Sequence, residues 1–253
     1  MYNLLRARFF KLSSFFARLV GAEVNQQEGT MEQALYVFDL DNTLIHGDSS
    51  TYWSRYLVRQ GIADSGEYLH HEERLMADYA RGEMDLHEYV ALTLSPLAAM
   101  PIAQVDRLVA NCVATEIVPR IYPQARALIA ELRAQNQPML IISASVSLLV
   151  NAIAPVLGIE HGIGVEVKTR NGCYSGEIDG TPSYQQGKIA CLDNFLARHP
   201  QYDGEVVFYT DSINDLPLCQ RADRVYLVNP CQKLAAHGEV MGWPVLNWRL
   251  TAV

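Results

Sequence analysis

This sequence lacks the residue patterns that most often form zinc or redox centres. Its five cysteines are widely spaced and include no C-x-x-C pair, and its seven histidines include no H-E-x-x-H. This usage predicts reduced thiols in a cytoplasmic protein and argues against a zinc site or a disulfide framework. No apolar run in the sequence is long enough to span a membrane.

Lysine is also scarce, and acidic residues outnumber basic ones. The chain of 253 residues contains four lysines and has a net charge of −8. Residues 1–30 hold four basic and two acidic residues, a charge of +2, so residues 31–253 carry −8 − 2 = −10. An acidic body argues against a nucleic-acid partner and weakly repels anionic substrates, which would therefore need local cations. The length and the 49% hydrophobic content suit one domain, or one domain with an insertion.

The first twenty residues form a basic amphipathic pattern. Five apolar residues share one helical stripe, and the basic residues lie off it (Leu5, Phe9, Leu12, Phe16 and Leu19 form the stripe). Such a helix could lie on an anionic membrane surface or dock on another segment. Alternatively, Met31, three residues before the first predicted strand, is the true start. We therefore treat residues 1–30 as a separate extension whose membrane contact stays open.

An apolar run at residues 34–38 leads directly into two aspartates, Asp39 and Asp41. The run predicts a buried strand, and side chains two residues apart point the same way. Both carboxylates should then face one space at the carboxyl end of the strand, where open α/β sheets bind ligands. Two close carboxylates repel each other unless a cation or a proton lies between them. The alternative is a turn at Asp41-Asn42, with Asp39 as a helix cap.

The pattern then changes twice along the chain. Residues 49–120 predict helices at 50–60, 67–81, 85–94 and 102–115, without a convincing strand. Helices at 123–136, 146–157, 183–198, 214–221 and 230–238 then alternate with strands at 139–143, 205–209 and 225–228. Residues 165–169 and 173–178 predict a hairpin across Asn171-Gly172. We expect a parallel α/β sheet interrupted by a helical insertion.

A second apolar strand also ends in carboxylates, Asp211 and Asp215. The ends of parallel strands share one sheet edge, so both pairs can converge and suit a hard cation such as Mg²⁺; a helix cap is the alternative. Ser143 ends another strand, where it could bind phosphate or simply cap. Lys188 opens a helix, which disfavours a cation unless an anion lies nearby, although a solvated surface lysine remains the alternative.

Together these features resemble the haloacid-dehalogenase (HAD) superfamily of phosphohydrolases. The D-x-D-x-T motif at residues 39–43, Ser143, Lys188 and the D-S-x-N-D motif at residues 211–215 occur in the family's order. The resemblance covers nearly all of residues 34–230. It implies a Rossmann-like parallel-sheet core at residues 31–48 and 121–253, with an all-helical cap at residues 49–120 inserted after the first strand. This cap position resembles subfamily IB, the phosphoserine-phosphatase-like subgroup.

The resemblance implies a reaction through an aspartyl-phosphate. Asp39 would be the nucleophile, and Asp41 would be the general acid for the leaving alkoxide and then the base for water. Ser143 and Lys188 would bind the phosphoryl oxygens.

The resemblance also implies Mg²⁺ as the cofactor. Asp39, the main-chain carbonyl of Asp41, and Asp211 would hold the ion, with Asp215 supporting it directly or through its ligands. Asn214 would orient Lys188 or the metal-bound water.

Substrate choice is expected to depend on Asp48. Phosphoserine phosphatases carry a Glu at the corresponding position, nine residues after the nucleophile, that binds the substrate's ammonium group. Asp48 keeps a carboxylate there, although capping the helix predicted near Ser50 is an equal alternative. The arginine-containing cap helix that binds the substrate carboxylate in those enzymes has no counterpart here.

The motif set, which includes Gly47-Asp48-Ser49-Ser50 and Gly242-Trp243-Pro244, resembles a bacterial branch often assigned as histidinol-phosphate phosphatases. We therefore expect histidinol phosphate as the small phosphorylated metabolite that is hydrolysed. Phosphoserine, or another amino-alcohol or lipid phosphate, is the alternative. A catalytically inactive binding module is the non-enzyme alternative, and the complete motif set argues against it. The sequence does not indicate an oligomeric state.

Overall fold

A computed structural model describes residues 34–250 of the chain. The predicted basic helix at residues 1–20 and the alternative start at Met31 therefore lie outside the described residues. None of the helices within residues 34–250 is both long and apolar enough to cross a membrane.

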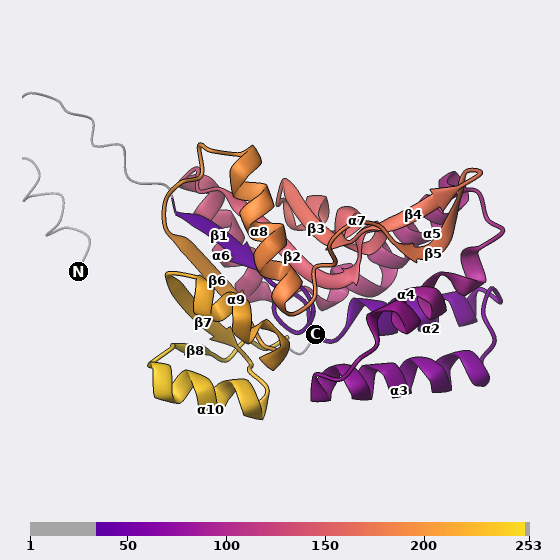
Figure 1. Cartoon of the computed structure of the whole chain (residues 1–253), viewed down its shortest axis with the longest axis horizontal. Helices are drawn as coiled ribbons and strands as arrows, with labels where there is room; N and C mark the ends of the chain where they lie inside the picture. The colour runs from indigo at the N-terminus through magenta and orange to yellow at the C-terminus, as the bar shows by residue number, and fades with distance from the viewer. Residues whose placement is uncertain (1–33, 251–253) are drawn as a thin grey trace, which may run out of the picture. The chain divides into compact units, whose positions relative to one another are not determined.

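The centre of the fold is a parallel sheet of six strands in the order β3-β2-β1-β6-β7-β8 (Figure 1). In chain order these strands are β1 (Leu35–Phe38), β2 (Met139–Val146), β3 (His161–Val165), β6 (Val206–Thr210), β7 (Arg224–Val228) and β8 (Val245–Leu246). All neighbouring strands pair in parallel. The chain runs outward from β1 in one direction and from β6 in the other, so the strand order reverses between these two neighbours. Ligands of open α/β sheets bind at such a point.

Helices cover both faces of this sheet, which explains why its central strands are almost wholly apolar. Phe38 and Ile141 pack on one face, in the cluster that includes α6 (Pro123–Ala134) and α7 (Ser147–Leu157). Val37 and Leu140 pack on the other face, in the cluster that includes α8 (Gln186–Arg198), α9 (Leu216–Arg221) and α10 (Gln232–Met241). Neighbouring residues of one strand thus serve opposite faces, as the pleat requires.

The segment between β1 and α6 is helical throughout its regular elements. It contains α2 (Ser49–Arg59), α3 (Glu67–Arg81), α4 (Leu86–Leu94), η1 (Ser95–Leu97) and α5 (Ile102–Cys112), followed by a π-helix, η2 (Val113–Ile117), and η3 (Val118–Arg120). This arrangement confirms the predicted α/β class with an all-helical insertion after the first strand. The hairpin of β4 (Val167–Arg170) and β5 (Cys173–Ile178) is also present, and β5 packs against α4.

Two short strands were not predicted, β3 and β8. The β3 sequence contains two glycines and little apolar character, so the sequence pattern is weak. Gly164 is nevertheless required, because a Cβ there would lie 2.7 Å from the main-chain oxygen of Ser145. The β2 strand also continues three residues past its predicted end at Ser143, which places Ser145 inside the strand. The helix predicted from residue 183 begins at Gln186, after Gln185 with a φ of 48°.

Candidate active site

The two carboxylate pairs converge because β1 and β6 are adjacent and in register. Phe38 is paired with Tyr209, and the main-chain N–H of Asp39 donates to the carbonyl of Tyr209 at 2.9 Å. Asp39 and Asp211 therefore leave neighbouring strands at the same edge of the sheet. The strand order reverses at this edge. The sequence predicted that the aspartates would share one edge of the sheet.

Lys188 lies between two of these carboxylates and is fully buried. Its Nζ is 2.7 Å from Oδ1 of Asp39 and 2.7 Å from Oδ1 of Asp215. The other carboxylate oxygen of Asp215 accepts a hydrogen bond from Oγ1 of Thr210 at 2.7 Å. Burial opposes the charge of Lys188, but Asp215 and Asp39 outweigh it and raise the pKa of the ammonium. Lys188 is thus a fixed cation at the sheet edge, and the solvated-lysine alternative is wrong.

Asp39 and Asp211 share one small donor. Oγ1 of Thr43 lies 3.4 Å from Oδ2 of Asp39 and 3.3 Å from Oδ1 of Asp211, and a hydroxyl has one proton to donate. Burial, with the charge of Asp215 and Asp41, raises the pKa of Asp39 to about 7 despite Lys188. Burial and the neighbouring Asp39 raise the pKa of Asp211 well above its usual range. This edge carries more negative charge than Lys188 offsets.

This excess of carboxylate suits a divalent cation. Within residues 34–250, no three side chains of His, Cys, Asp or Glu are grouped as a metal site on their own. Mg²⁺ usually needs only one or two protein carboxylates, with carbonyl, phosphate and water oxygens completing its shell. Asp39 and Asp211 are the two carboxylates that share Thr43, and burial, together with neighbouring carboxylates, raises the pKa of both. The residues present therefore fit the ion.

The Asp41 carboxyl group is held by two donors. Its Oδ1 accepts from the main-chain N–H of Ser49 at 2.6 Å, and its Oδ2 accepts from Oγ of Ser145 at 2.7 Å. Burial and the charge of Asp48 raise the pKa of Asp41 to about 7. A carboxyl group with this pKa can both give and take a proton near neutral pH.

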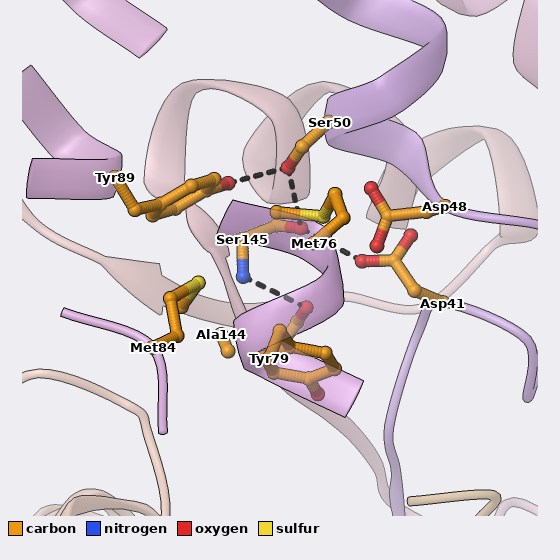
Figure 2. A pocket seen from close by; sticks show the side chains of 10 residues that line it. Asp41, Asp48, Ser50, Met76, Tyr79, Met84, Tyr89, Ala144 and Ser145 are labelled. Carbon is orange, nitrogen blue, oxygen red and sulfur yellow. Dashed lines mark hydrogen bonds between the residues drawn. The ribbon is translucent and has the colours of Figure 1, made fainter. Parts of the chain in front are cut away.

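A pocket lies between this edge and the helical insertion (Figure 2). Core residues and insertion residues both line it, and the figure shows Asp48 and Asp41 side by side. The lining consists of carboxylate, hydroxyl, thioether and aromatic groups: Asp41, Asp48, Ser50, Met76, Tyr79, Met84, Tyr89, Ser143, Ala144 and Ser145. No lysine, arginine or histidine is among them.

Asp48 is the helix cap that one interpretation of its sequence predicted, and it also lines the pocket. It is the N-cap of α2, and its Oδ1 accepts from the main-chain N–H of Thr51 at 2.9 Å. The same carboxyl group lines the pocket. Burial, with the charge of the nearby Glu72, raises its pKa to about 6. The group is therefore ionised at neutral pH and available to a cation.

Ser143 and Asn214 are both buried but differ in their contacts. Ser143 lines the pocket, and its Oγ accepts from the main-chain N–H of Ser145 at 3.1 Å. Nδ2 of Asn214 donates to the carbonyl of Tyr79 at 2.8 Å, at the end of α3. Asn214, in η4 (Ile213–Asp215) of the core, thus contacts the insertion, and its expected role in orienting Lys188 or water stays a prediction.

Two side chains that the sequence interpretation missed hold the end of α3 together with Asn214. Nε2 of Gln185 donates to the carbonyl of Gly82 at 3.1 Å, and Nζ of Lys233 lies 3.4 Å from the carbonyl of Arg81. The last carbonyls of a helix lack partners within it, so donors from elsewhere satisfy them. The sequence offered one signal for a role of Lys233, because the chain has only four lysines. Nothing in the sequence pattern marks Gln185.

Comparison with known proteins agrees with this geometry. The family model for haloacid dehalogenase-like hydrolases matches residues 36–220. The chain belongs to this family. The histidinol-phosphatase of Neisseria meningitidis serogroup C (strain 8013) is 34% identical over 219 residues, covering 85% of this chain and 99% of that protein.

Solved structures show the same HAD-like fold. A protein of unknown function from Bordetella pertussis Tohama I has a TM-score of 0.77 and 30% identity, covering 85% of this chain and 98% of that one. A substrate-bound phosphoserine phosphatase has a TM-score of 0.59 and 17% identity, covering 81% and 90%, and at that identity shows the fold alone. Membership of the hydrolase family, together with curated relatives that are named as phosphatases, makes this chain a phosphatase.

Proposed function

We propose that the chain is a Mg²⁺-dependent phosphomonoesterase that works through an aspartyl-phosphate on Asp39. The observation that carries the proposal is the pairing of Asp39 with the buried Lys188 at 2.7 Å, next to Asp41 at the same sheet edge. An oxygen of Asp39 attacks phosphorus while Lys188 and Ser143 bind the phosphoryl oxygens. Asp41 gives its proton to the leaving alkoxide and then takes one from the attacking water.

The metal would be held by the Asp39 and Asp211 carboxylates and the main-chain carbonyl of Asp41. Bound there, Mg²⁺ would supply positive charge to the phosphoryl group as it is transferred. Asp215 was expected to support the metal, directly or indirectly. Because both of its oxygens are engaged, by Lys188 and by Thr210, we propose that it acts by positioning Lys188.

Mg²⁺ should stabilise the folded protein even without substrate. A ligand that binds only the native state at a hundred times its Kd adds about 2.7 kcal/mol to the free energy of unfolding. For a chain of this size the melting temperature should rise by roughly 5–10 °C. The Asp211→Asn variant should lose this rise, whereas Asp193→Asn, which changes an exposed aspartate, should keep it. An equal rise in both variants would show that Mg²⁺ binds elsewhere.

We further propose a phosphomonoester with a cationic leaving group, histidinol phosphate in particular. Asp48 and Asp41 supply negative charge to the pocket, and none of its lining groups is cationic to accept a carboxylate. Histidinol phosphate has an amine and no carboxylate, whereas phosphoserine has both. The relative named histidinol-phosphatase supports the same choice. Phosphoserine and other amino-alcohol or lipid phosphates remain the alternatives.

The substrate proposal predicts a large preference that depends on Asp48. Asn is as good an N-cap as Asp, so Asp48→Asn removes the charge and keeps the cap of α2. We expect kcat/KM for histidinol phosphate to fall about 10- to 100-fold, the value of one hydrogen bond to a charged group, with little change for a neutral alkyl phosphate. Asp85→Asn, at the N-cap of α4, is the matched control and should change neither.

The same preference should depend on pH. The Asp48 carboxyl group is neutral below its pKa of about 6 and charged above it. The ratio of kcat/KM for 2-aminoethyl phosphate to that for the neutral ester should therefore rise from pH 5 to pH 7, and Asp48→Asn should make it flat. This substrate is used because its ammonium group stays protonated over the range, whereas the imidazole of histidinol phosphate titrates near pH 6.5. Titration of the phosphate cancels in the ratio. The histidinol-phosphate proposal is wrong if the wild type prefers phosphoserine. It is also wrong if Asp48→Asn lowers kcat/KM equally for the amine-bearing and the neutral substrate. Neither result would affect the proposed reaction class.

The division into core and cap is part of this proposal. We assign residues 31–48 and 121–253 to the catalytic core and residues 49–120 to a cap that selects the substrate. Asp48 lies at their boundary, since it follows the loop that carries Asp41 and begins α2. We also propose that the protein works in the cytoplasm, as its cysteine usage indicates.

A further inference from the structure

Ser145 connects Asp41, the proposed proton donor, to the helical insertion. It lies in β2, two residues after Ser143, and is 4% exposed. Its Oγ lies 2.7 Å from Oδ2 of Asp41, a carboxylate oxygen that the hydroxyl proton reaches directly. The same Oγ lies 3.0 Å from Oγ of Ser49 and 3.4 Å from Oγ of Ser50. Ser145 therefore touches both the reacting carboxyl group and the start of α2.

Proton counting gives this hydrogen-bond chain a direction. Ser145 has one hydroxyl proton, and an ionised Asp41 can only accept, so that proton points to Asp41. Toward Ser49 and Ser50 the oxygen of Ser145 must then accept. Ser50 also contacts the phenol oxygen of Tyr89 in α4, and if Ser50 donates to Ser145 then Tyr89 donates to Ser50. Figure 2 shows this series of hydroxyls running from Tyr89 to Asp41.

This direction matters because the carboxyl plane of an aspartate is otherwise loosely fixed. Rotation about the bond to a carboxylate is broad, so neighbouring donors decide where each oxygen points. The main-chain N–H of Ser49 can only donate, which keeps Oδ1 of Asp41 as an acceptor. A proton on Asp41 therefore belongs on Oδ2, the oxygen that Ser145 holds. The main-chain N–H of Ser49 thus selects Oδ2 as the oxygen that carries the proton, and the Ser145 hydroxyl holds that oxygen in place.

We propose that Ser145 is a positioning residue that aims the Oδ2 proton of Asp41 at the leaving oxygen. Ser50 and Tyr89 keep the Ser145 hydroxyl turned toward Asp41. Because Tyr89 lies in α4, proton donation by Asp41 then depends on the position of α4. This inference rests on the proposed phosphomonoesterase activity and adds to it a residue outside the recognised motifs. Without the Ser145 hydroxyl, Oδ2 loses its donor and the carboxyl group is free to rotate.

Two esters with different leaving groups separate positioning of the acid from general structural support. An alkoxide leaving group needs a proton from Asp41, whereas 4-nitrophenolate leaves without one. We expect Ser145→Ala to lower kcat/KM for propyl phosphate by about 10- to 100-fold, the cost of a misplaced catalytic group. The same variant should lower kcat/KM for 4-nitrophenyl phosphate less than about threefold. kcat/KM reports the step in which the leaving group departs, so later hydrolysis of the phosphoenzyme does not obscure the comparison.

Ser147→Ala is the matched control, because Ser147 is buried in the same stretch and its hydroxyl donates to Glu166 at 2.9 Å. Ser147→Ala should leave the ratio of the two kcat/KM values unchanged. Ser145→Thr keeps a hydroxyl and should return the ratio to the wild-type value. Both constants come from one sample, so a partly unfolded variant lowers them together without changing the ratio. If Ser145→Ala leaves the ratio unchanged, or if Ser147→Ala changes it equally, the inference is wrong. Turnover of both esters by the wild type would still uphold the proposed function in that case. Wild-type protein that hydrolyses neither ester would overturn the proposed function itself, and this inference with it.

Discussion

Asp39→Asn is expected to lower phosphomonoester turnover by about 10⁴-fold or more, the scale on which loss of a catalytic nucleophile acts. The amide matches the carboxylate in shape but is a far weaker nucleophile, so no aspartyl-phosphate forms. The buried Lys188 would still face Asp215 at 2.7 Å, which keeps the surrounding residues in place. The loss should therefore appear in kcat, measured with a phosphomonoester in excess Mg²⁺.

Asp193→Asn is the control for this variant, because Asp193 is exposed and pairs with Arg221 on the surface. It should keep wild-type turnover. Far-ultraviolet circular dichroism should give the same spectrum for both variants and the wild type. Turnover by Asp39→Asn within tenfold of the wild type would show that Asp39 does not attack phosphorus.

Lys188→Met is expected to lower the free energy of unfolding by about 3–5 kcal/mol near neutral pH. Methionine matches the length of the lysine stem and removes its charge, which leaves Asp39 and Asp215 buried without their shared cation. Turnover should also fall by about 10²- to 10³-fold, because the phosphoryl oxygens lose a fixed positive group. Urea unfolding monitored by circular dichroism measures the stability change.

The stability loss in Lys188→Met should depend on pH in a defined direction. Burial already raises the pKa of Asp39 to about 7, and removal of Lys188 raises it further. Above the unfolded-state pKa of about 4, the native variant then binds more protons than the unfolded chain, and its free energy of unfolding falls as pH rises. The wild type shows the same dependence up to the pKa of its own Asp39, about 7, so the deficit should be smallest at acidic pH and should grow above pH 7. Lys168→Met, which removes an exposed lysine, should show almost no deficit at any pH. Equal deficits at pH 4.5 and pH 8 would contradict the buried-charge account.

The sheet and the convergence of the aspartates were predictable because they depend on local patterns. An apolar run that ends in Asp39 or Asp211 predicts both the strand and the edge at which it ends. The weak strand β3 was missed because its place depends on Gly164, whose missing side chain matters only once β2 lies beside it. Close approach between distant segments leaves little trace in hydrophobic periodicity.

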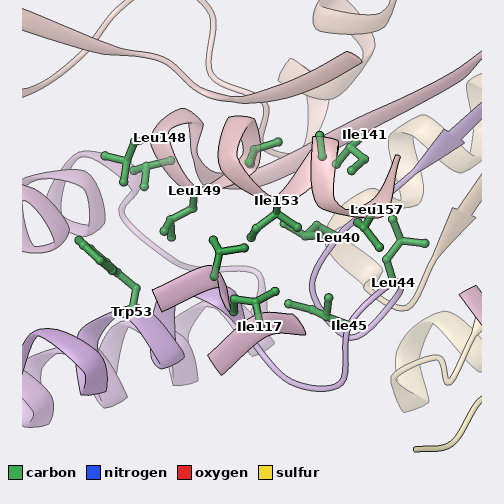
Figure 3. Packing of buried hydrophobic residues seen from close by; sticks show 14 of the residues in the cluster. Leu40, Leu44, Ile45, Trp53, Ile117, Ile141, Leu148, Leu149, Ile153 and Leu157 are labelled. Carbon is green, nitrogen blue, oxygen red and sulfur yellow. The ribbon is translucent and has the colours of Figure 1, made fainter. Parts of the chain in front are cut away.

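The helices of the insertion were also predictable, but their packing was not. Figure 3 shows Trp53 of α2 and Ile117 of the π-helix in the same apolar cluster as Leu148, Leu149 and Ile153 of α7. Trp53 is fully buried in this cluster. Helical periodicity identifies which face is apolar but does not identify what that face contacts. The contacts that decide the pocket wall therefore come from the structure.

The same limit applies within the site. The places of Asp39, Asp41, Lys188 and Asp211 follow from motif and strand order, and the match to the family model spans all four residues. The hydrogen bonds of Ser145 depend on three segments meeting, namely the β1 loop, β2 and the start of α2. A serine inside an apolar strand carries no sequence signal for such a role, since most such serines are satisfied by their own backbone.

The most direct test of the central claim is to find the covalent bond on Asp39. Wild-type protein would be mixed with a phosphomonoester and Mg²⁺, quenched during steady-state turnover, and treated with borohydride, which reduces an acyl phosphate to an alcohol. Peptide mass spectrometry should then find homoserine at position 39 only when substrate was present, and Asp41 unmodified. Homoserine at another aspartate, or unmodified Asp39 in samples quenched during rapid turnover, would contradict the aspartyl-phosphate mechanism.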